Sequence, residues 1–112
     1  MLIRSQNKEV LIAFESLLDV EVSGGVISAR RDMGWCCLLG EYSTKAKAMK
    51  VLDMIQEAYE EYKINCTFLT GFIGHRTIVE SNDIRVNGFE ELVKSFKKNM
   101  VFQMPEDSEV EE

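Results

Sequence analysis

The sequence predicts a single α+β domain in which an antiparallel β-meander packs against one amphipathic helix. Two patterns indicate this class: short apolar segments separated by turn residues in the first forty residues, and a longer stretch of helical periodicity after them. Hydrophobic residues form 46% and charged residues 29% of the 112-residue chain, with a single proline. This composition and length are typical of one folded core.

Five short segments have the composition and spacing of strands: residues 1–5, 10–14, 18–22, 26–30 and 35–39. The polar residues 6–8 between the first two segments suit a hairpin turn. The third segment alternates apolar and acidic side chains and ends at Gly24 and Gly25, which favour a hairpin turn. The last segment is a continuous apolar run that is too short for a helix. We therefore expect it to be a strand at the centre of the sheet.

A helix is predicted from Ser43 or Thr44, either of which can cap its first turn, to about Tyr62. Apolar residues recur there at three- and four-residue spacing: Ala48, Val51, Leu52, Ile55, Tyr59 and Tyr62. The opposite face is charged, so the apolar stripe is expected to cover the sheet.

The remaining part of the chain is predicted as an elaboration of this core. Residues 63–88 have strand-like composition interrupted by glycines, which predicts an inserted β-rich lobe formed by one long hairpin or by irregular structure. A second short helix is expected over residues 89–100, and a last strand over residues 101–104. Residues 1–105 would then form the domain, and residues 106–112 a flexible acidic tail.

Charge and cysteine content restrict the environment and the partners. The net charge is −6, but the last seven residues contain five of the nineteen acidic residues, so the body is nearly neutral. Such a body has no general attraction to nucleic acid or to an anionic membrane, and we expect no direct sequence-specific binding of nucleic acid. The three cysteines are an odd number, no segment resembles a secretory signal, and no apolar stretch approaches ~20 residues. These features predict a cytoplasmic protein that does not enter the membrane.

The sequence offers no strong catalytic or metal-binding pattern. His75 is the one histidine in the chain, and its position between Gly74 and Arg76 favours a surface turn. It could meet Cys66 if a hairpin joined them, but no motif supports such a pair. The adjacent Cys36 and Cys37 lack the two-residue gap of a zinc or redox pair. We therefore expect no catalytic residues, no metal and no cofactor.

The distribution of arginines suggests a binding surface. All five arginines fall in predicted strands or loops, whereas the lysines fall in predicted helices or at turns. Arginine offers a planar fork for phosphate or carboxylate groups, so arginines that converge could form an anion or nucleotide pocket, with an aromatic ring stacked on the base. The alternative is a set of scattered surface ion pairs. The candidate binding residues are Arg4, Arg30, Arg31, Trp35, Phe72, His75, Arg76 and Arg85.

Three blocks of sequence carry a resemblance: MLIRSQ at residues 1–6, LGEYST at 39–44 leading into KVLDMIQ at 50–56, and VFQMP at 101–105. Together they resemble a group of short proteins encoded by prophages and other mobile elements of Gram-positive bacteria. Residues 63–100 lie outside that pattern, which supports their interpretation as an elaboration. No functional residue is carried over from the group.

The resemblance implies a class of function, because small accessory proteins of such elements often disarm bacterial immunity. The first hypothesis is a non-enzymatic protein that binds a host defence effector, as anti-CRISPR proteins do. The alternative is a sponge that sequesters a cyclic-nucleotide or ADP-ribose-derived signal, like anti-Thoeris and anti-CBASS proteins, and that forms a homodimer or a larger assembly. A third hypothesis is a structural or morphogenesis accessory protein of the phage.

Overall fold

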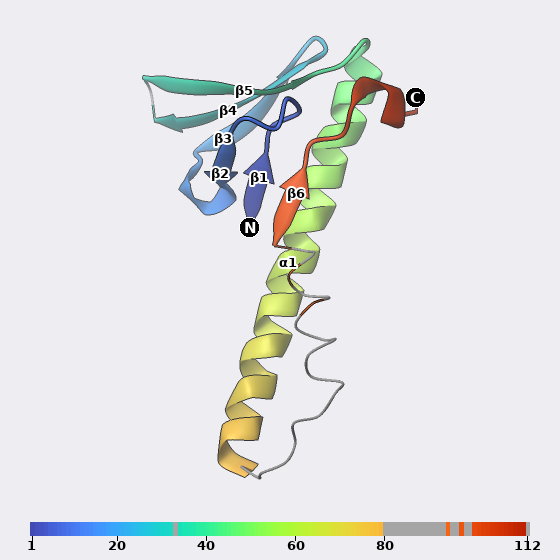
Figure 1. The fold of residues 1–112 in the computed structure, drawn as a ribbon. Helices are drawn as coiled ribbons and strands as arrows, with labels where there is room; N and C mark the ends of the chain where they lie inside the picture. Colours follow the sequence, from blue (N-terminus) through green and yellow to red (C-terminus); the bar gives the residue numbers. More distant parts are fainter. Residues whose placement is uncertain (33, 80–93, 95–96, 98–99, 112) are drawn as a thin grey trace.

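The structure is a computed structural model that describes residues 1–32, 34–79, 94, 97 and 100–111; of residues 69–79 it describes the backbone. It confirms the α+β class, because two three-stranded sheets lie beside one long helix (Figure 1). No helix among the described residues is both long and apolar enough to cross a membrane.

The first sheet joins the two ends of the described chain. Strands β1 (Leu2–Arg4) and β2 (Leu11–Ala13) form the predicted antiparallel hairpin, and β6 (Val101–Gln103) adds to the other side of β1 in parallel. Ile3 at the centre of β1 is fully buried and lies opposite Phe102. The predicted last strand is therefore present, and it is held beside the first strand of the chain.

The second sheet contains the last three strands of the predicted meander, whose first two strands belong to the other sheet. Strands β3 (Asp19–Ser23), β4 (Val26–Asp32) and β5 (Trp35–Glu41) are antiparallel, in the order β3-β4-β5. Gly24, with φ of +60°, lies in the two-residue turn between β3 and β4. This positive φ suits glycine at the first turn position of a hairpin.

One prediction about this sheet is wrong, because β4 and not β5 is the central strand. The apolar run of β5 does not have both faces covered: Cys36 is exposed and the Leu38 side chain is 53% exposed. A continuous apolar run indicates a strand, but it does not show how many neighbours that strand has.

Helix α1 (Lys45–Val79) begins after Thr44, whose Oγ1 accepts a hydrogen bond from the Lys47 N–H at 3.2 Å. Ala48, Val51 and Ile55 are buried, as the apolar stripe predicted. The core combines this face with the inner faces of both sheets. Its buried hydrophobic members are Met1, Ile3, Ile12, Ile27, Ala29, Leu39, Tyr42, Ala48, Val51, Ile55, Met104 and Val110.

The predicted end of the helix near Tyr62 is wrong, and so is the β-rich lobe as far as residue 79, since α1 continues through residues 63–79. A strand needs a neighbouring strand for its backbone hydrogen bonds, whereas a helix makes them within its own segment. Continuing an existing helix avoids the cost of a new nucleus. Figure 1 shows this part of α1 extending beyond both sheets. Residues 80–88 of the lobe and most of the predicted helix 89–100 lie outside the described residues.

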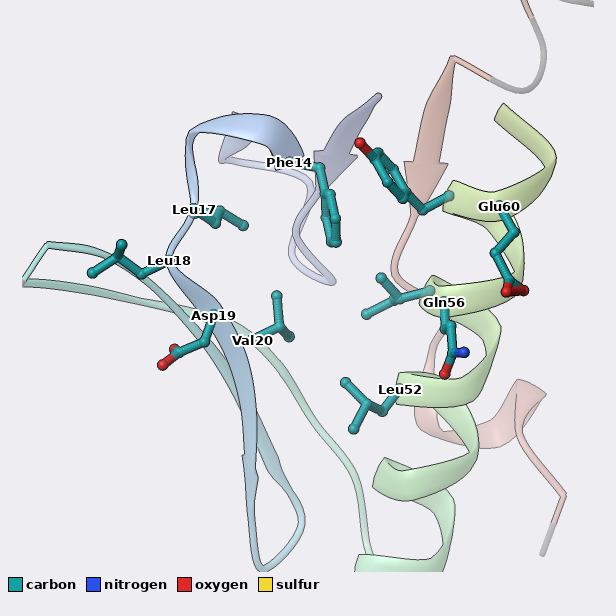
Figure 2. A pocket seen from close by; sticks show the side chains of 10 residues that line it. Phe14, Leu17, Leu18, Asp19, Val20, Leu52, Gln56 and Glu60 are labelled. Carbon is teal, nitrogen blue, oxygen red and sulfur yellow. The ribbon is translucent and has the colours of Figure 1, made fainter. Parts of the chain in front are cut away.

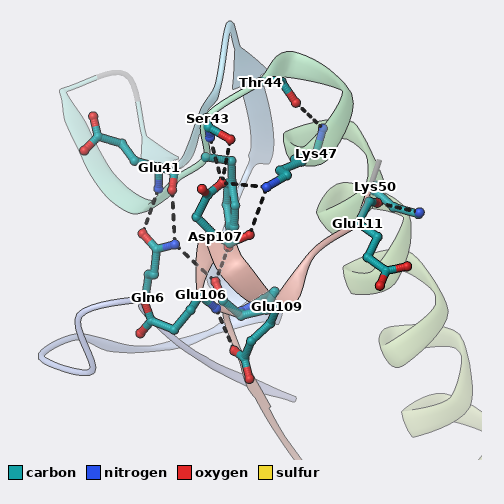
Figure 3. Close-up of polar contacts among 12 residues, drawn as sticks. Gln6, Glu41, Ser43, Thr44, Lys47, Lys50, Glu106, Asp107, Glu109 and Glu111 are labelled. Carbon is teal, nitrogen blue, oxygen red and sulfur yellow. Dashed lines mark hydrogen bonds and ion pairs between the residues drawn. The ribbon is translucent and has the colours of Figure 1, made fainter.

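Residues 106–111, expected to be a flexible tail, are instead docked on the start of α1 and are called the C-terminal clasp below (Figure 3). The Asp107 Oδ1 accepts hydrogen bonds from the Ser43 backbone N–H at 2.7 Å and from its Oγ at 3.1 Å, and lies 3.6 Å from the Lys47 Nζ. Val110 is buried. The first turn of α1 has no acidic residue of its own, so Asp107 supplies the negative charge that a helix N-terminus favours.

The residue just before the clasp, Pro105, is held by the loop that precedes α1. The Tyr42 hydroxyl donates a hydrogen bond to the Pro105 carbonyl oxygen at 2.7 Å. Burial, and then the carboxylates of Glu106, Asp107 and Glu109, raise the pKa of Tyr42 to about 12, so its hydroxyl keeps its proton at neutral pH. The Tyr42 hydroxyl therefore remains a hydrogen-bond donor to Pro105 at neutral pH.

The clasp is expected to make the free energy of unfolding decrease as the pH becomes acidic. The Ser43 N–H holds the pKa of the Asp107 carboxyl below its usual range. A lowered pKa in the folded state stabilises the protein above the unfolded-state pKa of about 3.9, and this contribution is lost as the pH falls through the lower folded pKa. Asp107→Asn should therefore unfold at lower urea concentration than the parent at pH 7, and the difference should shrink below about pH 4.

The matched control for this measurement is Asp53→Asn, on the exposed side of α1, for which no hydrogen bond or ion pair is described. It should leave the urea midpoint close to the parent value throughout the pH range. A difference between parent and Asp107→Asn that is the same at pH 3 and pH 7 would rule out the carboxylate contact as its source.

Candidate functional site

An apolar cleft opens between α1 and the segment that joins β2 to β3 (Figure 2). Its volume is about 410 Å³, within the range of roughly 300–1,000 Å³ that is usual for ligand sites. The lining residues are Phe14, Leu17, Leu18, Asp19, Val20, Leu52, Ile55, Gln56, Tyr59 and Glu60.

One wall of the cleft follows from the short 3-10 helix η1 (Phe14–Ser16) and the start of β3. The turn of η1 directs the chain from one sheet to the other. Figure 2 shows Phe14, Leu17 and Val20 pointing toward the helix, while Leu18 stands at the outer rim. Because Leu17 and Leu18 are adjacent, they cannot both turn inward, and the Leu18 side chain is 66% exposed.

The opposite wall is one face of α1. Leu52, Ile55 and Tyr59 are spaced three and four residues apart, so they lie on the same side of the helix. The Tyr59 ring packs against the Phe14 ring with centroids 4.5 Å apart, which closes one end of the cleft. Ile55 is 2% exposed and belongs to the core. The cleft is therefore a gap in side-chain packing directly over the core.

The charged groups at the cleft are acidic. Asp19 and Glu60 are the charged members of the lining set, which contains no basic residue. The Arg30 guanidinium donates to both carboxylate oxygens of Asp19, the shorter contact being 2.6 Å, and this hydrogen bonding holds the pKa of Asp19 below its usual range. The rim thus has negative character, with one of its two carboxylates already paired.

A second ion pair lies at the base of η1. The Met1 ammonium donates hydrogen bonds to the Glu15 carboxylate oxygens at 2.9 and 2.8 Å. Partial burial acts to raise the pKa of Glu15, but the hydrogen bonds from the ammonium and from the Glu15 backbone, together with the charges of the ammonium and Lys63, outweigh it, so the pKa lies below its usual range. This contact holds the start of η1 against β1 and so fixes the position of Phe14.

The arginines predicted as an anion pocket are divided between the two sheets. Arg4 is on β1 and donates to the Lys8 carbonyl oxygen at 3.1 Å. Arg30 and Arg31 are adjacent on β4, where the pairing with β5 shifts its register between Arg30 and Asp32. Arg30 is paired with acidic residues of β3, and the Arg31 guanidinium lies 4.9 Å from the centre of the Trp35 ring. The structure therefore brings Arg31 and Trp35 together, but not Arg4 with them.

The other predicted binding residues fall on or after the far part of α1. Phe72, His75 and Arg76 are helical, so the surface turn predicted around His75 is wrong. Cys66 and His75 share this helix, about 14 Å apart along its axis, and the hairpin that would have paired them is absent from residues 63–79. Arg85 lies outside the described residues.

The Cys37 thiol is not activated. Burial, and then the neighbouring Cys36, raise the pKa of the Cys37 thiol, which favours the unreactive protonated form. Within the described ranges, no three histidine, cysteine or acidic side chains are grouped closely enough to hold a metal ion.

Sequence reasoning did not identify the cleft. Leu52, Ile55 and Tyr59 of its helical wall belong to the predicted core-facing stripe, and the opposite wall falls in the predicted strands 10–14 and 18–22 and the residues between them. The available signal was the adjacent pair Leu17 and Leu18, because two neighbouring leucines in an extended segment leave one of them exposed.

The chain matches no protein-family model, and neither curated proteins nor solved structures give a significant match to it.

Proposed function

We propose that this chain is a non-enzymatic protein of a mobile element that inhibits a bacterial defence effector by receiving an apolar side chain of that effector in the cleft. The observation that carries the proposal is an exposed leucine, Leu18, at the rim of an open apolar cleft. Fully burying a leucine side chain stabilises a complex by about 1.5–3 kcal/mol, which is typical of a central interface residue.

The negative charge of the molecule favours binding to an effector with a basic surface. The chain has a net charge of −6, and the exposed side of α1 next to the cleft carries Asp53, Glu57, Glu60 and Glu61. Opposite charges on two partners accelerate their association and exclude partners of the wrong sign. Defence effectors that act on nucleic acids have the basic surfaces that this arrangement would favour.

The same charges disfavour the sponge hypothesis for the cleft. A cyclic nucleotide or an ADP-ribose derivative carries phosphate, and the cleft presents Asp19 and Glu60 with no basic lining residue. Arg30, the nearest guanidinium to Asp19, is already bonded to that carboxylate. An anionic ligand would have to displace this pair, whereas an apolar side chain flanked by lysine or arginine would not.

The test is a challenge assay in cells that each carry one defined immune system. Expression of the parent chain should restore phage infection in the presence of one of these systems. Leu18→Asp should abolish the rescue and weaken binding to the purified effector by about 100-fold, since it removes the leucine that the complex would bury and places a charge in an apolar contact.

Leu38→Asp is the matched control, because Leu38 is also exposed, at 53%, but lies on β5 and not at the cleft. It should rescue infection as well as the parent does. Rescue by Leu18→Asp at the parent level, or failure of the parent to inhibit any system, would contradict the proposal. Stable self-assembly, or binding to a phage protein without any rescue, would instead favour the structural-protein hypothesis.

A further inference from the structure

The strand next to the cleft, β3, is an edge strand. It pairs with β4 on one side, in the order β3-β4-β5. Ser23 and Val26 flank the two-residue turn, and residues in that position exchange both backbone hydrogen bonds. Pairing then alternates along the strand, so the N–H and C=O groups of Val20 and Val22 point away from β4.

These outward groups have no backbone partner beyond their own sheet in the part of the chain that the structure describes. The opposite edge of the sheet is different. At the end of β5, the Gln6 N–H donates to the Leu39 carbonyl oxygen at 2.8 Å, and the Gln6 Oε1 accepts from the Glu41 N–H at 2.9 Å. The β5 edge is thus partly covered by Gln6, whereas β3 offers two successive open positions.

The two faces of β3 differ in chemistry. Val20 and Val22 are partly buried and pack against the core, and Val20 lines the cleft. Asp19 and Glu21 lie on the other face, with carboxylate oxygens 2.6 and 3.7 Å from Arg30 nitrogens. Two carboxylates against one guanidinium leave this face negative.

We infer that β3 accepts an extended segment of the partner as an added strand, in which apolar residues alternate with lysine or arginine. This inference rests on the proposed function and specifies how the partner occupies the cleft. The apolar residues of the added strand would lie beside Val20 and Val22 and enter the cleft, while the basic residues would lie on the side of Asp19 and Glu21. Backbone hydrogen bonds hold such a strand, and alternate side chains select it.

The test uses a fluorescein-labelled peptide of six alternating lysine and valine residues, and a control peptide in which three lysines precede three valines. The alternating peptide should bind the parent chain at least tenfold more tightly, which is about 1.4 kcal/mol. Its binding should slow hydrogen exchange of the Val20 and Val22 amides, measured by NMR, and leave the amides of Asp19 and Glu21 unchanged.

Two variants separate strand addition from simple attraction. Val22→Pro removes an outward N–H that the sheet does not use, so it should fold and bind the alternating peptide at least tenfold more weakly. Glu21→Lys, on the exposed face, should weaken binding to a similar extent at low salt and less at high salt. If Val22→Pro does not fold, the comparison of the two peptides and the exchange of the Val20 and Val22 amides decide the question.

Equal binding of the two peptides, or no slowing of exchange at Val20 and Val22, would overturn strand addition. The proposed function would still stand if Leu18→Asp abolished inhibition of the effector. If Leu18→Asp inhibited normally while the alternating peptide protected β3, the proposed function would fail and the strand-binding edge would remain.

Discussion

Ile55→Ala is expected to lower the free energy of unfolding by about 3 kcal/mol, because it removes buried methyl and methylene groups and leaves a cavity that the surroundings fill incompletely. Ile55 is 2% exposed and lies where α1 packs on the sheets and where the cleft has its floor. Urea denaturation followed by circular dichroism would measure the change. The slope of the transition should stay the same, since the surface exposed on unfolding is nearly unchanged.

The chain provides a control with the same substitution on the same helix. Ile64 is 68% exposed on α1, so Ile64→Ala should change the free energy of unfolding by no more than about 0.5 kcal/mol. Equal losses for the two variants would mean that helix propensity, and not burial against the sheets, determines the effect. The predicted difference therefore tests whether the first half of α1 is the half that holds the core.

Gly25→Ala is the second large change, expected to cost about 3 kcal/mol through overlap of backbone atoms. A Cβ atom at this position would overlap the carbonyl oxygen of Tyr42, which is backbone and cannot turn aside. The Tyr42 N–H also donates to the Gly25 carbonyl oxygen at 2.7 Å. Forcing these segments apart would break that hydrogen bond and disturb the loop that leads into α1.

The neighbouring Gly24→Ala is the control for the turn itself. A Cβ atom on Gly24 meets nothing within 4 Å, but the residue has φ of +60°, so alanine there should cost about 1 kcal/mol. Thermal unfolding of both variants would rank them. A smaller loss for Gly25→Ala than for Gly24→Ala would show that the loop before α1 can move away from the hairpin.

Both large effects concern contacts that also shape the candidate site. Ile55 forms the floor of the cleft, and the Gly25 contact fixes the hairpin that contains β3 relative to α1. The C-terminal clasp holds the start of the same helix through Asp107. The two walls of the cleft are therefore positioned by core packing, a backbone hydrogen bond and the clasp, which favours a pre-formed binding site.

Several elements of the fold were predictable because their signals are local. Alternation over residues 18–22 followed by two glycines specifies a hairpin, and the spacing of Ala48, Val51 and Ile55 behind Thr44 specifies an amphipathic helix with a capped start. These signals depend on side chains within a few residues of one another. The structure confirms each of them.

Composition led to a wrong prediction where a segment could form either a strand or a helix. Residues 63–79 are rich in β-branched and aromatic side chains, yet they are helical. Strand propensity reflects packing against cross-strand neighbours, so it contributes little to stability where a segment has no neighbouring strand. The acidic C-terminal residues misled in a similar way, because a run of charges suggests a solvated tail unless a helix N-terminus lies within reach.

By itself, the sequence determined the α+β class, the two hairpins, the start of the long helix and the face of that helix that is buried. The tertiary structure alone decided that β6 pairs with β1, that Asp107 reaches Ser43 and that Leu17 and Leu18 line a cleft together with residues of α1. The physical reason is separation along the chain. Local patterns fix the dihedral angles and the faces of elements, but contacts between distant residues depend on how those elements pack together.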